Sequence, residues 1–298
     1  MTSHGLRSTS RFNILLYRHV YGTAFRHVRF NLTFDAYHIC LATRETHGNV
    51  YPKKYVQAKA MEEEYSRLAE TIRKQANAHP KSRYLVAIAG IPGSGKTTIA
   101  QEVVYQLNQV TPKAVILSMD GFHLSRAALD QLPDPKEAHI RRGAPWTFDV
   151  NRFVCFVRQL RTWADDTPLA CPGSETWSDI DILRAPTFDH EAKDPVENGI
   201  SVTPDASIII LEGNYLLLNE PGWQEIAELA DYHVFVDTDP QEARGRLARR
   251  HLRAGIEKTL EEGYRRVDSN DFLNAILIRE KLLTPDMVLT SVAVDSDT

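Results

Sequence analysis

The sequence of 298 residues is poor in cysteine and has no long apolar segment. Its three cysteines, Cys40, Cys155 and Cys171, are scattered, so we expect a reducing compartment without a disulfide framework or a zinc site. No apolar run approaches the ~20 residues of a membrane span, and we expect no membrane association. The net charge of −4 gives no overall electrostatic case for binding nucleic acid.

Positive charge is concentrated at the start of the chain. Residues 1–60 carry nine Lys or Arg against two Asp or Glu, and the rest of the chain is acidic. The first 30 residues contain five arginines and no acid, which is typical of a mitochondrial transit peptide. A disordered basic tail or an extension from an upstream start also fits, because Met61 opens the helical segment "MEEEYSRLAETIRKQ". We predict a basic, disordered extension over 1–60, one folded domain over 61–298 and a cytoplasmic protein, with a mitochondrial location as the alternative.

Five short apolar runs alternate with helical segments along the folded part of the chain. This alternation predicts an α/β fold, a doubly wound and mainly parallel sheet with helices on both faces. The region 165–206 contains several prolines and predicts an irregular insert with short strands. The strands are expected over 83–90, 113–120, 206–218, 231–239 and 285–292, and the helices over 61–78, 97–108, 149–163, 240–253 and 257–281.

The segment "AGIPGSGKTTIA" joins the first predicted strand to a predicted helix. It contains the pattern Gly90-x-x-x-x-Gly95-Lys96-Thr97 of a phosphate-binding loop. Glycines let the backbone wrap an anion with its N–H groups, and the helix N-terminus adds its dipole. A plain glycine turn would rarely need this lysine for phosphate and this threonine for Mg²⁺. We predict that ATP is bound by Gly90, Pro92, Gly93, Ser94, Gly95, Lys96, Thr97 and Thr98.

Polar side chains follow two further predicted strands at the point where each strand ends. Asp120 and His123 follow the second strand, and Glu212 and Asn214 follow the third. Ligands of doubly wound sheets bind at the carboxyl ends of the strands, so we expect these residues to converge on the phosphate loop. The two carboxylates suit a kinase, which needs one acid to deprotonate an acceptor hydroxyl and another group to hold Mg²⁺.

The arginine-rich segment "RGRLARRHLRAG" could cover the triphosphate. Arg246, Arg249, Arg250 and Arg253 recur at helical spacing, which places them on one face of a helix. A solvated basic helix is the alternative, but in an otherwise acidic chain we favour a lid over the phosphates. We expect Arg246 and Arg249 to bind ATP, and Arg250 to act in catalysis with Lys96 and Asp120.

Taken together, several motifs resemble one family. "GIPGSGKTT", "SMDGFH", "RRGAPWTFD", "PTFDHEAKDP", "ILEGNYLLL" and "RLARRHLRAG" occur in the order found in the phosphoribulokinase/uridine kinase family, which includes bacterial-type pantothenate kinases and fructose-kinase-like relatives. The resemblance covers residues 83–292 and implies a P-loop NTPase fold with a helical lid. Phe188-Asp189 stands directly before His190, closer to the pantothenate-kinase spacing, but the stretch 171–186 is longer than that pattern has.

The resemblance also implies roles for individual residues. Asp120 resembles the general base near the metal, Glu212 the acid that contacts Mg²⁺, and Thr97 the hydroxyl on the metal side. His190 matches a substrate-contacting histidine, with a hydrogen-bonded loop histidine as the alternative. The acceptor is expected to contact His123, Arg142, Asp149, His190 and Asn214.

The sequence therefore predicts a Mg²⁺- and ATP-dependent kinase that phosphorylates a hydroxyl of a small metabolite, such as a nucleoside, a pantothenate-like molecule or a sugar. The alternatives are a nucleoside triphosphate hydrolase and a nucleotide-binding regulator without an acceptor. No guanine-reading "NKxD" motif of switch GTPases is present. We expect a small-molecule substrate and no nucleic-acid partner, and a homodimer is compatible with the sequence.

Overall fold

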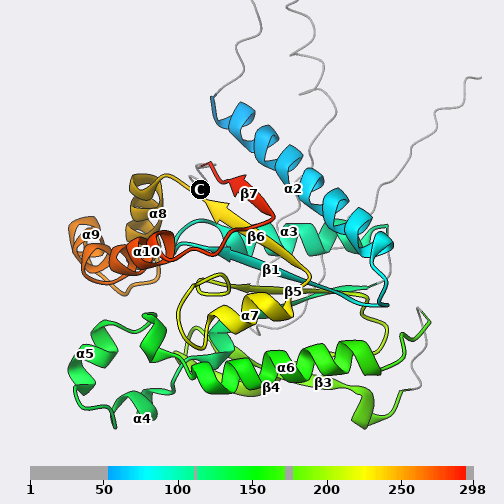
Figure 1. Ribbon diagram of the computed structural model, residues 1–298. Coiled ribbons are helices and arrows are strands. Elements are labelled where there is room, and N and C mark those ends of the chain that lie inside the picture. Colours follow the sequence, from blue (N-terminus) through cyan, green and yellow to red (C-terminus); the bar gives the residue numbers. More distant parts are fainter. Residues whose placement is uncertain (1–52, 111–112, 172–176, 293–298) are drawn as a thin grey trace, which may run out of the picture. The chain divides into compact units, whose positions relative to one another are not determined.

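The computed structural model describes residues 53–110, 113–171 and 177–292 (Figure 1). These residues belong to the compact unit Tyr51–Thr298. The prediction of a disordered extension falls almost entirely on residues 1–52, outside the described residues. The first described helix, α2 (Lys53–Ala78), begins eight residues before Met61. It therefore includes the last residues of the segment assigned to the extension.

A five-stranded parallel sheet forms the centre of the domain. The strand order is β2-β5-β1-β6-β7, and each neighbouring pair is parallel. The predicted doubly wound parallel sheet is confirmed. Each strand is somewhat shorter than the apolar run that predicted it, most of all β5, because the buried residues 215–218 continue as a loop. The strands are β1 (Tyr84–Gly90), β2 (Ala114–Ser118), β5 (Ile208–Gly213), β6 (Tyr232–Asp237) and β7 (Met287–Thr290).

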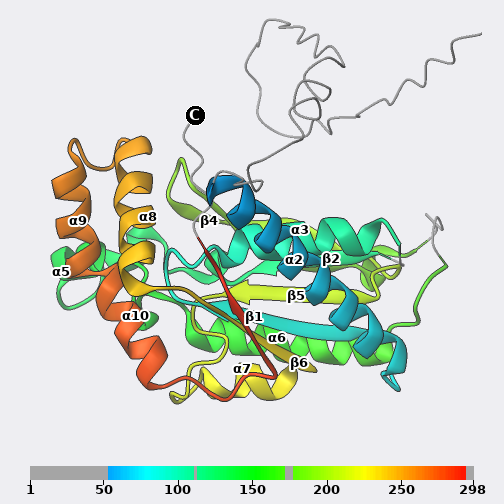
Figure 2. The same cartoon turned by 90° about the horizontal axis from the view of Figure 1, so that it is seen from above.

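Helices cover both faces of this sheet, so its strands are apolar throughout. Residues of β1 alternate between the two faces. Val86 and Ile88 pack with α2 and α3 (Lys96–Asn108) on one face. Leu85 and Ala87 pack with α6 (Val150–Asp166) and α7 (Gln224–Leu229) on the other. Figures 1 and 2 show the sheet between these two layers.

Two segments outside the sheet complete the domain. A 3₁₀ turn (Met119–Phe122), α4 (Arg126–Leu129), α5 (Pro135–Ile140) and a second 3₁₀ turn (Pro145–Thr147) connect β2 to α6. The predicted insert contains an antiparallel hairpin of β3 (Leu183–Asp189) and β4 (Asp194–Val202). None of the described helices is long and apolar enough to cross a membrane.

The single helix expected over 257–281 is two helices. After α8 (Pro240–Arg253), the chain forms α9 (Leu260–Ser269) and α10 (Asp271–Glu280), with a break at Asn270. No proline or glycine marks the break. Asn270 instead has φ −137° and ψ −70°, and its side chain holds Arg142 O (2.9 Å) and Arg141 Nε (3.1 Å) of a distant loop. This tertiary interaction overrides the local helical periodicity.

Arg83 connects several segments by hydrogen bonds at the end of the sheet opposite the phosphate loop. Its guanidinium is fully buried, lies 4.4 Å from the centroid of the Trp163 ring, and has no carboxylate partner among the described residues. Burial lowers its pKa below the ordinary value. Backbone carbonyls satisfy the charge instead. They belong to Ala164, Thr167, Pro168, Pro204 and Ala206.

Candidate active site

The phosphate loop has the glycine-dependent backbone that its pattern predicts. Gly93 and Gly95 have φ values of 79° and 86°, in the left-handed region that glycine adopts without strain. A Cβ on Gly90 would lie 2.8 Å from the carbonyl oxygen of Val236, so this position also requires glycine. Helix α3 begins at Lys96, directly after the loop. Its N-terminal N–H groups and dipole therefore favour an anion at the loop.

Glu212 ends β5 beside the loop, as the sequence predicts. It pairs with Ile88 of β1 and Ser118 of β2 in the sheet register, and it is 4% exposed. Its carboxylate accepts hydrogen bonds from Ser118 Oγ (2.7 Å) and Thr97 Oγ1 (3.1 Å). Burial raises the pKa of Glu212, while the positive charge of Lys96 opposes that rise. Two predicted metal-side oxygens, from Thr97 and Glu212, are thus in direct contact.

Lys96 lies within the same group of charges. Burial lowers the pKa of its ammonium, and the negative charges of Glu212 and Asp120 oppose this effect. The charge of Arg250 lowers the same pKa, so Arg250 lies close enough to act on the site. The structure therefore brings together Lys96, Asp120 and Arg250, which the sequence predicts as catalytic residues, and Glu212, which it predicts as a metal ligand.

Glycines bring the acidic loop close to its neighbours. Asp120 lies in the 3₁₀ turn after β2, its N–H bonded to Ser118 Oγ (3.2 Å), and its side chain is 40% exposed. A Cβ on Gly121 would lie 2.2 Å from Pro186 O of β3, and one on Gly213 would lie 2.5 Å from Met119 Cβ. The glycines of "DGF" and "LEG" thus allow backbone approaches that position both acids.

A cluster of aromatic rings lies next to Asp120. The His123 ring packs between Phe148 (centroids 3.9 Å apart) and Phe188 (4.9 Å apart). Its Nδ1 lies 2.8 Å from the backbone oxygen of Asp120 and 4.0 Å from the Asp120 carboxylate. A carbonyl only accepts, so Nδ1 carries the proton and Nε2 of the neutral ring is an acceptor. Burial lowers the pKa of His123, which favours this neutral form.

Two other residues that were predicted to contact the phosphate acceptor, Arg142 and His190, lie beside this aromatic cluster. The Arg142 guanidinium lies 5.3 Å from the Phe188 ring centroid and donates to Leu124 O (2.8 Å) and Asp194 Oδ1 (3.2 Å). Its Nε is buried without a partner. The exposed His190 ring meets the edge of Phe188 at 5.3 Å. Both residues are therefore beside the ring that packs on His123.

Asp149 and Asn214 have different surroundings. Asp149 caps α6, with its Oδ1 accepting from the Arg152 N–H at 3.0 Å. One of its oxygens thus has a structural role that the sequence analysis did not assign. Asn214 follows the Glu212-Gly213 end of β5, and its buried Oδ1 has no hydrogen-bond partner. An unpaired buried carbonyl of this kind is costly unless a ligand or water satisfies it.

The arginines of α8 divide into two groups. Arg246 Nη1 donates to Gly93 O and Ser94 O, both at 3.3 Å, and to Ser291 Oγ at 3.0 Å, while Nη2 pairs with Glu242. Arg246 therefore braces the back of the phosphate loop, a contact that the sequence did not reveal. Arg249 and Arg250 are exposed and available to a ligand.

The oxygen donors at the loop fit Mg²⁺. Among the residues that the structure describes, no cluster of three or more His, Cys, Asp or Glu side chains forms a metal site. Mg²⁺ in kinases usually takes only one or two carboxylates, with phosphate oxygens and water completing its coordination. Thr97 and Glu212, with Asp120 nearby, are such a hard-oxygen set. The residues present therefore fit the ion.

The sequence did not indicate that two phenylalanines pack against His123 next to Asp120. Phe148 and Phe188 lie within the quoted motifs "RRGAPWTFD" and "PTFDHEAKDP", but they were not assigned as site residues. Their position next to the acidic residues of those motifs was the available signal. Ser118, which holds Glu212, was missed for a different reason, since nothing local shows that two strand ends meet.

Comparison with known proteins identifies the family. No family model matches the chain. A Schizosaccharomyces pombe protein, named provisionally as uridine kinase C227.14, is 37% identical over 230 residues, which cover 76% of this chain and 89% of that protein. ATP-dependent kinase YFH7 of Lachancea thermotolerans is 37% identical over 231 residues, 70% of this chain and 65% of the relative.

Two solved structures have the same fold. A provisionally named fructose transport system kinase from Silicibacter sp. TM1040 is 27% identical with a TM-score of 0.63, covering 76% of this chain and 98% of that chain. YFH7 from Saccharomyces cerevisiae, a P-loop protein, is 26% identical with the same TM-score and coverage. The chain therefore belongs to the phosphoribulokinase/uridine kinase family and is an ATP-dependent P-loop kinase.

Proposed function

We propose that the protein transfers the γ-phosphoryl group of ATP to a hydroxyl of a small metabolite. The observation that carries this proposal is the position of Asp120. Its partly exposed carboxylate lies 4.0 Å from His123 Nδ1, and its negative charge acts on Lys96 at the phosphate loop. A nucleotide on the loop and an acceptor hydroxyl next to the aromatic cluster would meet at this carboxylate.

The chain's own groups account for each part of the transfer. Loop N–H groups and Lys96 bind the phosphates, and Arg250 faces them from α8. Thr97 and Glu212 would hold Mg²⁺, which supplies charge neutralisation on the β- and γ-phosphates when bound. Asp120 accepts the proton of the acceptor hydroxyl. The acceptor oxygen forms a bond to the γ-phosphorus. At the same time the bond between the γ-phosphorus and the oxygen that bridges the β- and γ-phosphates breaks, and ADP leaves.

The groups beside Asp120 support one class of acceptor. His123 and Phe188 are partly exposed and offer aromatic surface, and Nε2 of the neutral His123 ring and Asn214 Oδ1 can accept hydrogen bonds. An acceptor with a small flat or apolar part and at least two donor groups fits this surface. The names of the relatives, uridine kinase and fructose transport system kinase, support a nucleoside or sugar acceptor.

The test is a metabolite-pool screen for ATP-dependent phosphorylation, with products identified by mass spectrometry, followed by paired rates in two variants. Asp120→Asn is expected to slow transfer by about 10²-fold or more, the scale of a positioned acid–base group, and to slow background ATP hydrolysis much less. Glu212→Gln is expected to damage both reactions and raise the Mg²⁺ requirement. Asp166→Asn, the same change at an exposed residue at the end of α6, is the matched control.

Two results would contradict the proposal. Equal slowing of hydrolysis and transfer in Asp120→Asn would remove the base role. If no metabolite accelerates ATP consumption, the nucleoside triphosphate hydrolase remains as the better account.

A further inference from the structure

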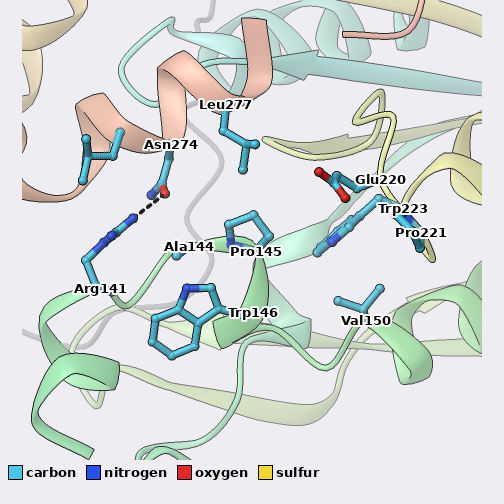
Figure 3. A pocket seen from close by; sticks show the side chains of 11 residues that line it. Arg141, Ala144, Pro145, Trp146, Val150, Glu220, Pro221, Trp223, Asn274 and Leu277 are labelled. Atoms are coloured by element: carbon cyan, nitrogen blue, oxygen red, sulfur yellow. Dashed lines mark hydrogen bonds between the residues drawn. The ribbon is translucent and has the colours of Figure 1, made fainter. Parts of the chain in front are cut away.

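A groove of about 350 Å³ lies outside the active site. Figure 3 shows Pro145, Trp146 and Val150 on one side and Leu277 of α10 on the other, with Trp223 next to Glu220 and Pro221. None of its lining residues belongs to the phosphate loop or to the aromatic cluster of His123, Phe148 and Phe188, and Asp120 and Glu212 do not line it. The volume is within the range of small-molecule sites, which are typically apolar with a few polar groups.

Two neighbouring arginines at the edge of this groove contact different segments of the chain. The Arg142 guanidinium donates hydrogen bonds to Leu124 O and Asp194 Oδ1. Arg141 extends the opposite way, to Asn270 Oδ1 (3.1 Å) and Asn274 Oδ1 (3.4 Å) at the start of α10. Tyr215 Oη donates to Gly143 O at 2.5 Å and holds the backbone of residues 141–145 at this point. The groove is therefore lined by other residues than the aromatic cluster, which it adjoins where Trp223 packs against Phe148 (ring centroids 5.9 Å apart).

The polar groups of the groove give it a cationic end. Arg141 uses Nε and Nη2 for its two asparagine contacts, and within the described part of the chain Nη1 has no partner and Arg141 has no ion pair. Glu220, at the other end of the groove, is neutralised by its ion pair with Lys281. Asp271 begins α10, and its carboxylate lies 3.3 Å from His251 Nε2. Arg141 Nη1 is thus the free charged donor of the groove.

We propose that this groove binds an amphipathic carboxylate, with the carboxylate on Arg141 and the apolar chain between Trp146 and α10. A planar guanidinium suits a carboxylate, and the tryptophan, proline and leucine walls suit an alkyl or aryl body. The proposal stands independently of the phosphate acceptor.

The walls allow a test with little risk to folding. Leu273 lines the groove and is 43% exposed, and Ile276 lies three residues further on α10, 41% exposed and outside the groove. Replacing each by Gln makes a matched pair that differs only in access to the groove. Arg141→Gln removes the cationic end, with its melting temperature as the folding check.

The experiment is calorimetric titration of the full-length protein with octanoate and with octylamine, which inverts the head-group charge. Saturable binding of octanoate is expected, weakened by about tenfold or more in Arg141→Gln, since a hydrogen bond to a charged group is lost. Leu273→Gln should also weaken octanoate binding, Ile276→Gln should not, and saturating ATP should leave it unchanged. Octanoate should change the tryptophan fluorescence, and Trp146→Phe should remove the part of this change that comes from Trp146.

Several results would overturn the proposal. They are no saturable octanoate binding, equal binding of octylamine, equal weakening by Leu273→Gln and Ile276→Gln, or displacement of octanoate by ATP. The last result would place octanoate in the active site.

Discussion

Gly121→Ala tests whether the close approach of the acidic loop to β3 positions the catalytic group. The new Cβ would lie 2.2 Å from Pro186 O and 2.6 Å from Pro186 C, both backbone atoms that cannot rotate away. Unstrained carbon contacts need about 3.5 Å, so the loop or the hairpin must move by about 1 Å. That movement would shift Asp120 relative to the aromatic cluster, because Phe188 of β3 packs against His123 there.

Two magnitudes follow for this substitution. Overpacking of this kind costs about 1–3 kcal/mol in the free energy of unfolding. In a domain of this size that lowers the melting temperature by about 2–12 °C. A misplacement of about 1 Å can cost about 10²-fold in rate, so acceptor-dependent ADP formation should fall by that factor while ATP binding is retained.

Calorimetric melting and initial rates with the acceptor from the screen measure both effects. Gly245→Ala is the control, because its Cβ would meet only the Arg249 side chain at 3.4 Å within α8. Its melting temperature should equal or exceed that of the wild type, since alanine favours helix over glycine. If Gly121→Ala keeps both its melting temperature and its rate, the loop tolerates displacement and the positioning argument is wrong.

Three further predictions concern single residues. Lys96→Ala should abolish turnover and weaken ATP binding strongly in a titration, because the loop's fixed cation is lost; near-normal affinity would remove the phosphate role. Arg83→Met should lower the free energy of unfolding by about 3–5 kcal/mol in urea denaturation, because its five carbonyl partners lose their donors; a cost below 1 kcal/mol would contradict it. The pKa of His123 is lowered in the fold, so the unfolded chain binds more protons below about pH 6.5. Stability should therefore fall as pH drops from about 6.5, and His123→Phe should reduce this fall; an unchanged pH slope would show that His123 is not its source.

The sequence predicted the parts of the fold that are local. Apolar runs predicted the five strands, and the loop pattern predicted the glycine-dependent backbone before α3. The acids at the ends of two strands converge because the carboxyl ends of parallel strands meet at the same edge of the sheet. Contacts between distant segments could not be predicted in this way. The break at Asn270 depends on a loop more than 120 residues away. Likewise, the periodicity of α8 places Arg246 on the lid face but does not show that loop carbonyls occupy its guanidinium.

The carbonyl cage around Arg83 has a consequence for how this scaffold can change. It lies at the amino ends of the strands, whereas the phosphate loop, Asp120 and Glu212 lie at their carboxyl ends. Apart from Asn214, the surfaces that would recognise an acceptor belong to residues 119–149 and to the β3–β4 hairpin, and neither contributes a strand to the five-stranded sheet. Residues that secure the fold and residues that choose the acceptor are thus spatially separate. Such a division lets the acceptor pocket diversify in evolution, or by design, while the structural foundation stays unaltered.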